Sequence, residues 1–342
     1  MHNSYKYYRT NQIGIMENLV DAIDRFKNQR VAIIGDVFLD QSIRGEVERL
    51  NPEKLGVPLV RVTDIEFWLG GAGNVARNLA SLGASCYLLG QIGNDKYGEK
   101  IRELCREEGT KTIFADSGRE TIVKQRIFTD GHYVARVDFG EKMLVPIDHE
   151  AEEYLEKKLT EEMDSNHYNL ILFSDYNKGM FKGNLARRVI GISKSKKILT
   201  LVDPKPENIN YFFGCDILRP NKREAEEIAG IKHNGNNLRD IALKLTEKVH
   251  PKYLAITCGG DGAFAYDIER DHSELVSTKR VKLADVTGAG DTFAAALGLG
   301  MVSGLDFKSS VRLANIASAI VVGKVGTSVT TATELKETIM GE

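Results

Sequence analysis

Cysteine is scarce in this sequence, and its few residues are far apart. The four positions are Cys86, Cys105, Cys215 and Cys258, so no CxxC pair occurs. A cysteine-based zinc site needs closely spaced pairs, and a disulfide scaffold needs more cysteines in a shorter chain. We therefore expect neither, and the pattern favours reduced, buried thiols in a cytoplasmic protein.

The sequence also lacks a long hydrophobic run and an excess of either charge. No window approaches the roughly 20 apolar residues of a membrane span, and the N-terminal stretch "MHNSYKYYRTNQIGIMENL" has no continuous apolar core of the signal-peptide kind. The 46 basic and 48 acidic residues give a net charge of −2, which provides no general surface for nucleic acid or anionic lipid. We predict a cytoplasmic protein with neither nucleic acid nor a membrane as partner.

What the sequence has in quantity is an alternation of apolar runs and helical patterns. Its 342 residues, 42% of them hydrophobic, are enough for a substantial core. Residues 1–28 resemble a polar arm with a short amphipathic helix, ahead of a domain at 29–342. Five apolar runs predict buried strands, at 30–40, 85–93, 169–175, 197–203 and 253–259. Because helical patterns lie between them, we predict an α/β fold with a parallel sheet covered by helices on both faces.

Two segments interrupt this alternation. Residues 42–68 and 121–139 have β-like composition and few helical signals. The second contains a predicted hairpin turn at Thr129, Asp130 and Gly131. We expect the two insertions to form one small accessory sheet, which acts as a lid over the main domain or as a dimer interface.

Two glycine-rich turns open predicted helices, "GGAGN" at 70–74 and "GAGD" at 288–291. Neither matches the common phosphate loop GxxxxGK[ST], and no GxGxxG follows the first strand, which disfavours a nicotinamide-dependent oxidoreductase. A helix N-terminus attracts anions. Asp291 at such a place is either a helix-start residue or a group that does chemistry beside a phosphate.

Four motifs taken together resemble the ribokinase-type (PfkB) sugar kinase family. "GGAGNVARNLASLGA" and "DVTGAGDTFAAALG" match its two signature regions, "RPNKREAE" its Asn-x-x-Glu segment, and "TCGGDGAF" its Thr-x-Gly-x-x-Gly loop. The resemblance runs from about residue 30 to 335. It implies a ribokinase-like three-layer α/β domain, with a mostly parallel central sheet and a small β-sheet lid.

The resemblance assigns the reaction chemistry to the "GAGD" turn. Phosphoryl transfer needs positioning, charge neutralisation and an oriented nucleophile. Gly288, Ala289 and Gly290 would form an anion hole, in which the amides of Ala289, Gly290 and Asp291 stabilise the transferring phosphoryl group. Asp291 would accept the proton of the attacking sugar hydroxyl.

The resemblance places ATP and its metal ions on the C-terminal half. Thr257, Gly259, Gly262 and Asn315 would line the nucleotide site. Asn221 and Glu224 would hold Mg²⁺ through water, although such a pair is often only a helix cap and a solvated acid. Asp285 and Thr287 match positions that hold a monovalent cation in some members, and potassium is the candidate ion.

The acceptor sugar is expected on the N-terminal side. Asp36, Gly71 and Asn74 would contact its hydroxyls, and a buried Asp36 needs a ligand or another partner. Five basic residues could bind an acceptor phosphate, and we expect two of them to do so. These are Lys124, Arg126, Arg136, Lys178 and Lys205.

Further stretches resemble the heptose 7-phosphate kinase branch of the family. They are "IGDVFLDQSIRGEVERLNPEKLGVPLVRV", "SDYNKGMF", "LVDPKPEN" and "VVGKVGTSVT". This branch phosphorylates the anomeric hydroxyl to give heptose 1,7-bisphosphate, on the route to ADP-heptose and bacterial surface polysaccharide. The resemblance implies a separate nucleotidyltransferase later in the route and, by analogy, a homodimer formed through the lid.

Other functions remain open at this point. "NPEKLG" stands where the branch usually has Ser-Pro-Glu, which affects the acceptor's identity. The alternatives are a kinase for fructose 6-phosphate, tagatose 6-phosphate or an unphosphorylated, ribose-like sugar, and a non-catalytic sugar sensor. The presence of Asp291, Asn221 and Glu224 argues against the sensor, because a sensor needs no base.

Overall fold

The apolar runs form a nine-stranded sheet in a computed structural model, which describes residues 14, 16–50, 58–116, 118–141, 146–278, 286–324, 326 and 328–341. The strand order is β13-β12-β11-β10-β9-β8-β1-β4-β5. Neighbours from β5 to β11 pair in parallel, whereas β12 and β13 are antiparallel. The strands are β1 (Arg30–Gly35), β4 (Ser85–Ile92), β5 (Lys111–Asp116), β8 (Leu170–Ser174), β9 (Leu199–Asp203), β10 (Ile217–Leu218), β11 (Tyr253–Thr257), β12 (Ala263–Asp267) and β13 (His272–Val276).

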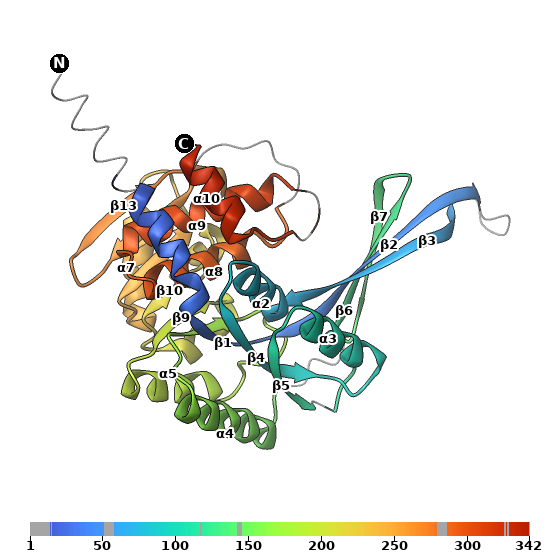
Figure 1. Ribbon diagram of the computed structural model, residues 1–342, viewed down its shortest axis with the longest axis horizontal. Coiled ribbons are helices and arrows are strands. Elements are labelled where there is room, and N and C mark those ends of the chain that lie inside the picture. Colours follow the sequence, from blue (N-terminus) through green and yellow to red (C-terminus); the bar gives the residue numbers. More distant parts are fainter. Residues whose placement is uncertain are drawn as a thin grey trace, which may run out of the picture.

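Helices cover both faces of this sheet, because its central strands are apolar on both sides. In β1, Val31 and Ile33 join one hydrophobic cluster and Ala32 and Ile34 the other. Helices α2 (Ala72–Ser81), α3 (Lys96–Glu107), α8 (Ala289–Val302), α9 (Phe307–Val322) and α10 (Ala332–Met340) contribute to the first cluster. Helices α4 (His149–Ser165), α5 (Leu185–Ser195), α6 (Lys222–Ala229) and α7 (Leu238–Val249) contribute to the second. Figure 1 shows the resulting three layers, and the predicted fold class is confirmed.

The N-terminal helix packs into the first cluster. Residues 16–24 are helical, and Leu19, Ala22 and Ile23 are buried there together with Phe26 of the short helix η1 (Phe26–Asn28). The amphipathic pattern of this stretch thus has a structural cause, because its apolar stripe faces the core. The predicted polar arm, residues 1–13, lies outside the described residues.

A second, four-stranded sheet projects away from the main body in Figure 1. Its order is β3-β2-β6-β7, from β2 (Val37–Leu50), β3 (Pro58–Gly71), β6 (Val123–Thr129) and β7 (His132–Phe139). The hairpin turn is confirmed, because Asp130 and Gly131 join β6 to β7 with φ of 47° and 78°. Positive φ at both central positions is typical of a type I′ turn. The "NPEKLG" stretch lies outside the described residues.

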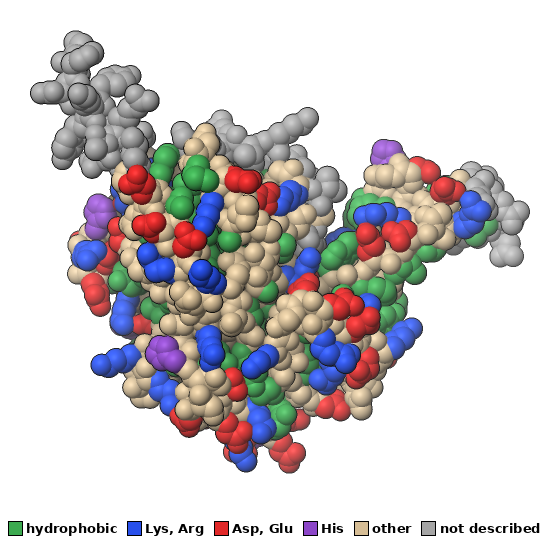
Figure 2. Space-filling view, viewed as in Figure 1, with side chains coloured by type: hydrophobic (Ala, Val, Ile, Leu, Met, Phe, Trp, Pro, Cys, Tyr) green, Lys and Arg blue, Asp and Glu red, His purple; other side chains and the backbone are tan. Residues whose placement is uncertain are grey.

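The projecting sheet has one polar and one apolar face. Residues opposite each other in the register share a face, and alternate residues point to opposite faces. One row joins Asp40, Lys124 and Asp138 on the polar face. The row next to it joins Gln41, Gln125 and Val137, in which the two glutamines bond to each other at 2.6 Å and are polar exceptions on a mainly apolar face. The apolar face continues through further side chains that are partly or largely exposed: Ile43, Ile65, Ile127 and Phe139. Figure 2 shows hydrophobic and charged side chains together along this arm.

The described residues test two predictions, one about the few cysteines and one about the missing long hydrophobic run. All four cysteines are free and buried, as expected. Among the helices that the structure describes, none combines the length and apolarity that a bilayer crossing requires.

Gly35 at the end of β1 should be intolerant of any side chain. A Cβ there would lie 2.2 Å from the Ser174 carbonyl oxygen and 2.8 Å from Ala72 Cβ. We expect Gly35→Ala to lower the free energy of unfolding by about 1–3 kcal/mol, because neither neighbour can yield easily. Urea denaturation measures this. Gly191→Ala is the control, since a Cβ there meets nothing within 4 Å; it should be neutral or stabilising by up to about 1 kcal/mol. Equal destabilisation of both variants would contradict the prediction.

Candidate functional site

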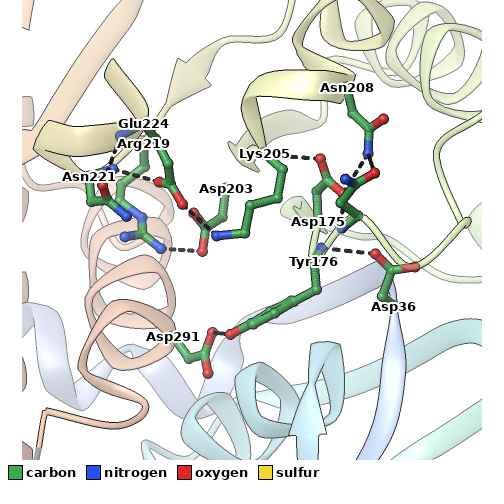
Figure 3. Close-up of polar contacts among 11 residues, drawn as sticks. Asp36, Asp175, Tyr176, Asp203, Lys205, Asn208, Arg219, Asn221, Glu224 and Asp291 are labelled. Atoms are coloured by element: carbon green, nitrogen blue, oxygen red, sulfur yellow. Dashed lines mark hydrogen bonds and ion pairs between the residues drawn. The ribbon is translucent and has the colours of Figure 1, made fainter. Parts of the chain in front are cut away.

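Four charged residues lie at the carboxyl ends of four adjacent strands. Asp36 follows β1, Asp175 follows β8, Asp203 ends β9 and Arg219 follows β10. Side chains at this edge of an open α/β sheet converge on the usual ligand-binding crevice. Figure 3 shows how they surround Tyr176 and Lys205, with Asp291 below them.

Asp291 lies at this edge of the sheet, buried in the first turn of α8 and held by two hydrogen-bond donors. Asn74 Nδ2 donates to Oδ2 at 2.6 Å, and the Tyr176 hydroxyl donates to Oδ1 at 2.7 Å. Only 4% of the Asp291 surface is exposed. Burial raises the pKa of Asp291, and the two hydrogen bonds and Arg219 oppose that rise. The carboxylate is therefore fixed in orientation and made more basic than an exposed one.

The glycine turn ahead of Asp291 adopts the expected helix-start geometry. Gly288 has φ of 82° and forms the N-cap of α8, which no side chain caps. The Ala289 amide donates to the Val286 carbonyl at 3.3 Å, so it is used within the turn. The first amides of a helix lack partners within that helix. Those of Gly290 and Asp291 are thus better suited to an anion than that of Ala289.

Arg219 lies against this turn, a residue that sequence reasoning did not single out. It is 4% exposed, and a Cβ at Gly290 would approach both terminal guanidinium nitrogens to 3.2 Å. One of these nitrogens donates to Asp203, and Nε has no hydrogen-bond partner among the described residues. The carboxylates around Arg219 raise its pKa despite its burial. A permanent cation therefore stands beside the anion-binding end of α8.

Asn221 and Glu224 form a capping box at the start of α6. Asn221 Oδ1 accepts from the Glu224 amide and Glu224 Oε2 accepts from the Asn221 amide, each at 2.9 Å. The two residues thus cap the helix, which was one of the two interpretations of this pair. The other carboxylate oxygen of Glu224 pairs with Lys205.

This corner suits a magnesium ion held mostly by phosphate and water. Glu224 and Asp203 are buried carboxylates here, and each already pairs with a cation. Among the described residues, no group of three or more acidic, histidine or cysteine side chains could hold a metal by itself. Mg²⁺ commonly takes one or two protein carboxylates and completes its shell with substrate phosphate and water. The donor set fits that mode and not an all-protein cage.

A cavity of about 660 Å³ extends from the glycine turn across the end of β11. It contains five of the six predicted nucleotide residues, and Ala289, Gly290 and Arg219 line its inner end. The five are Asn221, Thr257, Gly259, Gly262 and Asn315. Gly262 has φ of 96°, and a Cβ there would lie 2.1 Å from the Val276 carbonyl oxygen. Asn315 donates to the same carbonyl at 2.8 Å, so both residues fix this wall.

On the acceptor side, Asp36 finds its partners in the backbone. Its carboxylate accepts the amides of Tyr176, Lys178 and Met180 at 2.9, 3.0 and 3.0 Å. The need for a partner is thus met, and one acceptor position of four remains for another donor. Burial raises the pKa of Asp36, which these three bonds oppose.

Gly71 and Asn74 stand at the start of α2. Gly71 has φ of 59°, and a Cβ there would lie 2.2 Å from the Asp36 carbonyl oxygen. Asn74 is buried, and its Oδ1 has no partner among the described residues. Because Asn74 Nδ2 is bound to Asp291, this oxygen is a free acceptor beside that carboxylate.

The five basic candidates divide between two places. Lys205 lies with Glu224 on the nucleotide side. The other four lie on or beside the polar face of the small sheet. Arg126 pairs with Asp40 at 2.5 Å, Arg136 with Asp138 at 2.7 Å and Lys178 with Glu141 at 2.9 Å.

Lys124 differs from the other candidates. Its Nζ lies 3.6 Å from the centre of the Phe38 ring, and the described residues give it no carboxylate partner within ion-pair distance. Burial lowers the pKa of Lys124 to about 8. It is thus the most readily available cation on the polar face for an anionic ligand.

The structure describes only one of the two residues expected to hold a monovalent cation. Asp285 lies outside the described residues, and Thr287 lies in the turn just before α8.

Sequence reasoning missed the residues that connect the site. Tyr176, Asp203 and Arg219 all occur in stretches that carry the family resemblance, yet none was assigned a role. Their position directly after apolar strands was the available signal, because ligands bind at strand ends in this fold class.

Comparisons with known proteins identify the family and the fold of this chain. The sequence pattern described as "pfkB family carbohydrate kinase" matches residues 28–334. A D-beta-D-heptose 7-phosphate kinase from Bordetella bronchiseptica is 34% identical over 91% of this chain and 96% of its own length. Bifunctional HldE proteins from Helicobacter hepaticus and Campylobacter curvus are 35% and 33% identical over 92% and 91% of this chain. The chain spans only 64% and 65% of those two relatives.

Solved structures share the fold at low identity. Phosphofructokinase-2 from Escherichia coli, in complex with potassium, superimposes with a TM-score of 0.76 at 19% identity, over 92% of this chain and 98% of that one. A ribokinase from Arabidopsis thaliana with ribose and ATP gives 0.66 at 17% identity, over 91% and 98%.

Proposed function

Since this chain belongs to the pfkB family of carbohydrate kinases, we propose that it transfers the γ-phosphoryl group of ATP to the anomeric hydroxyl of a heptose 7-phosphate. The product is the corresponding heptose 1,7-bisphosphate. The main supporting observation is the Asp291 carboxylate, which Asn74 and Tyr176 hold directly after Ala289 and Gly290, two residues that line the 660 Å³ cavity. The named heptose 7-phosphate kinase relative supports this acceptor.

Asp291 is the general base in this mechanism. It takes the proton of the anomeric hydroxyl while that oxygen attacks the γ-phosphorus. The bond to the bridging oxygen breaks, and ADP leaves. Burial of Asp291 favours this role, since a raised pKa makes the carboxylate a stronger proton acceptor.

Two features of the chain would stabilise the negative charge that develops during phosphoryl transfer. The N-terminus of α8 presents the amides of Gly290 and Asp291. Arg219 stands beside them as a buried cation. Bound Mg²⁺ would supply further neutralisation of phosphate charge, with Asn221 and Glu224 holding it through water. Asp285 and Thr287 remain our candidates for potassium beside the same turn.

The acceptor phosphate is bound on the polar face of the small sheet. Lys124, Arg136 and Lys178 come close enough to influence the ionisation of Asp138. Arg136 and Lys178 hold carboxylates of their own, whereas Lys124 is free to pair with an incoming dianion. Charge-assisted hydrogen bonds to phosphate are among the strong ones in proteins.

Asp291→Asn should lower kcat by about 10²–10⁴-fold, because the amide cannot accept the proton. The coupled assay of ADP release with heptose 7-phosphate measures this, and the circular dichroism spectrum should be unchanged. Asp164→Asn, at an exposed acid of α4, is the control and should keep full activity. Full activity of Asp291→Asn would remove the proposed base.

The same assay should be run on a panel of acceptors. It should include heptose 7-phosphate, fructose 6-phosphate, tagatose 6-phosphate, ribose and unphosphorylated heptose. We expect the highest kcat/KM with heptose 7-phosphate. ADP release that no sugar stimulates would favour a sugar sensor, and a preference for another acceptor would reassign the substrate.

Lys124→Met should raise KM for heptose 7-phosphate by about 10–100-fold, because one charged hydrogen bond is lost. KM for ATP and turnover of unphosphorylated heptose should change little. Lys158→Met, on the exposed side of α4, is the matched control. Because burial lowers the pKa of Lys124 to about 8, kcat/KM for the phosphorylated acceptor should fall as pH rises through about 8. That fall should be absent from Lys124→Met, and its persistence would assign it to another group.

The apolar face of the small sheet supports a homodimer. Val62 and Ile65 of β3 and Val137 and Phe139 of β7 share this face and are between 39% and 49% exposed. Exposed apolar areas of this kind commonly mark interfaces. We propose that a second copy of the chain covers this face.

Ile65→Lys combined with Val137→Lys should convert that dimer to a monomer. A buried ammonium without a partner is costly, so the interface cannot tolerate it. Sedimentation velocity at several protein concentrations measures the change. Arg44→Ala, on the other face of β2, is the control and should leave the mass unchanged. A wild-type protein that is already monomeric would reject the dimer.

A further inference from the structure

Tyr176 connects the Asp291 carboxylate to the loop that follows β8. It follows β8 by two residues and was not among the expected site residues. Its hydroxyl donates to Asp291 Oδ1 at 2.7 Å, over a separation of 115 residues in sequence. Figure 3 shows the ring extending from the strand end across the site to Asp291.

Both ends of Tyr176 are held by carboxylates. Its amide donates to Asp36 Oδ2 at 2.9 Å, while its hydroxyl donates to Asp291. Asp175 accepts the Asn177 amide at 2.8 Å and thereby fixes the same loop from the other side. The backbone anchors do not depend on the hydroxyl. Its removal should therefore leave the loop in place.

Three side chains hold the ring of Tyr176 between them. Phe38 packs edge to face with a centroid distance of 5.3 Å. Lys124 Nζ lies 5.7 Å from the ring centre and Lys205 Nζ lies 5.6 Å from it. The two lysines belong to the acceptor side and the nucleotide side respectively. The ring thus stands between the two halves of the site with little freedom to turn.

We propose that Tyr176 is a positioning residue for the reaction, whose hydroxyl fixes the Asp291 carboxylate in its reactive orientation and favours its ionised form. This inference rests on the proposed function of Asp291 as the base. Tyr176 itself neither loses nor gains a proton in the reaction. With Asn74 on Oδ2 and Tyr176 on Oδ1, the carboxylate cannot rotate without losing a bond.

The charges around Asp291 agree with this role. Arg219 favours its ionised form, whereas Asp40 and the nearby Asp203 disfavour it. Asn74 contributes a neutral donor from α2. The pKa of Tyr176 is raised well above its usual value by burial and by Asp291, so its hydroxyl stays protonated and remains a donor. Removing the hydroxyl leaves the Asn74 amide and the Arg219 cation to oppose the effect of burial on this carboxylate.

Tyr176→Phe tests the proposal, because it removes the hydroxyl and keeps the ring between Phe38 and the lysines. We expect kcat to fall about 10–100-fold, the equivalent of one hydrogen bond to a charged group. KM for ATP should stay within about twofold. The acid limb of kcat/KM for the acceptor should move to higher pH, because the pKa of Asp291 rises when a donor is lost. A merely structural role would not move that limb.

Tyr168→Phe is the matched control. Its hydroxyl donates to Glu162 at 3.1 Å, and both residues line a separate cavity that contains none of the site residues. It should change neither kcat nor the pH profile. Thermal unfolding of both variants checks that neither loses its fold.

The outcomes separate this inference from the proposed function. If Asp291→Asn is inactive while Tyr176→Phe keeps the kcat and acid limb of the wild type, the base stands and Tyr176 has no positioning role. If Asp291→Asn is fully active, the proposed function fails and the inference fails with it. A lower kcat in Tyr176→Phe with an unmoved acid limb would also overturn the claim that the hydroxyl favours the ionised carboxylate.

Discussion

The burial of Asp36 is the constraint on which the site depends. A buried carboxylate is costly unless donors surround it. Here the backbone amides of three alternate residues in the loop after β8 supply them: Tyr176, Lys178 and Met180. The Asp36 carbonyl also accepts the Ala72 amide at 3.0 Å, which sets the start of α2. One residue thereby positions both donors to Asp291, because Tyr176 lies on the bound loop and Asn74 lies in the helix. Asp36 thus organises this part of the site through its contacts with the backbone.

The cations of the candidate site form two groups. Arg219 is buried and Lys205 is half-buried, and they pair with Asp203 and Glu224 on the proposed nucleotide side, where the phosphates of ATP would bring further negative charge. Lys124, Arg136 and Lys178 face the acceptor side. A buried ion pair is weak evidence for stability, since desolvation offsets its attraction. Anion binding therefore explains these paired cations better than stability does.

The alternating faces of the small sheet suit the two roles that we propose for it. Asp40, Lys124 and Asp138 share a row on the polar face, which also carries Arg126 and Arg136. The opposite face bears Ile65 and Val137, which are 47% and 39% exposed. A strand period of two assigns neighbouring residues to different surfaces. The same eight or so residues of a strand can thus bind a ligand and a second copy of the chain.

The sequence by itself determined the layered fold, the hairpin turn at Asp130 and Gly131, and the wall of the cavity at Thr257, Gly259 and Gly262. These features follow from local chemistry: apolar runs make buried strands, and glycine permits positive φ. Only the tertiary structure decided that Tyr176 reaches Asp291, that Arg219 stands beside Gly290, and that Lys124 has no carboxylate partner among the described residues. The physical reason is that such pairings join residues at strand ends to the start of α8, which lies far away in the chain. Asn74 and Asp291 are separated by 217 residues, and no local pattern encodes a contact over that distance.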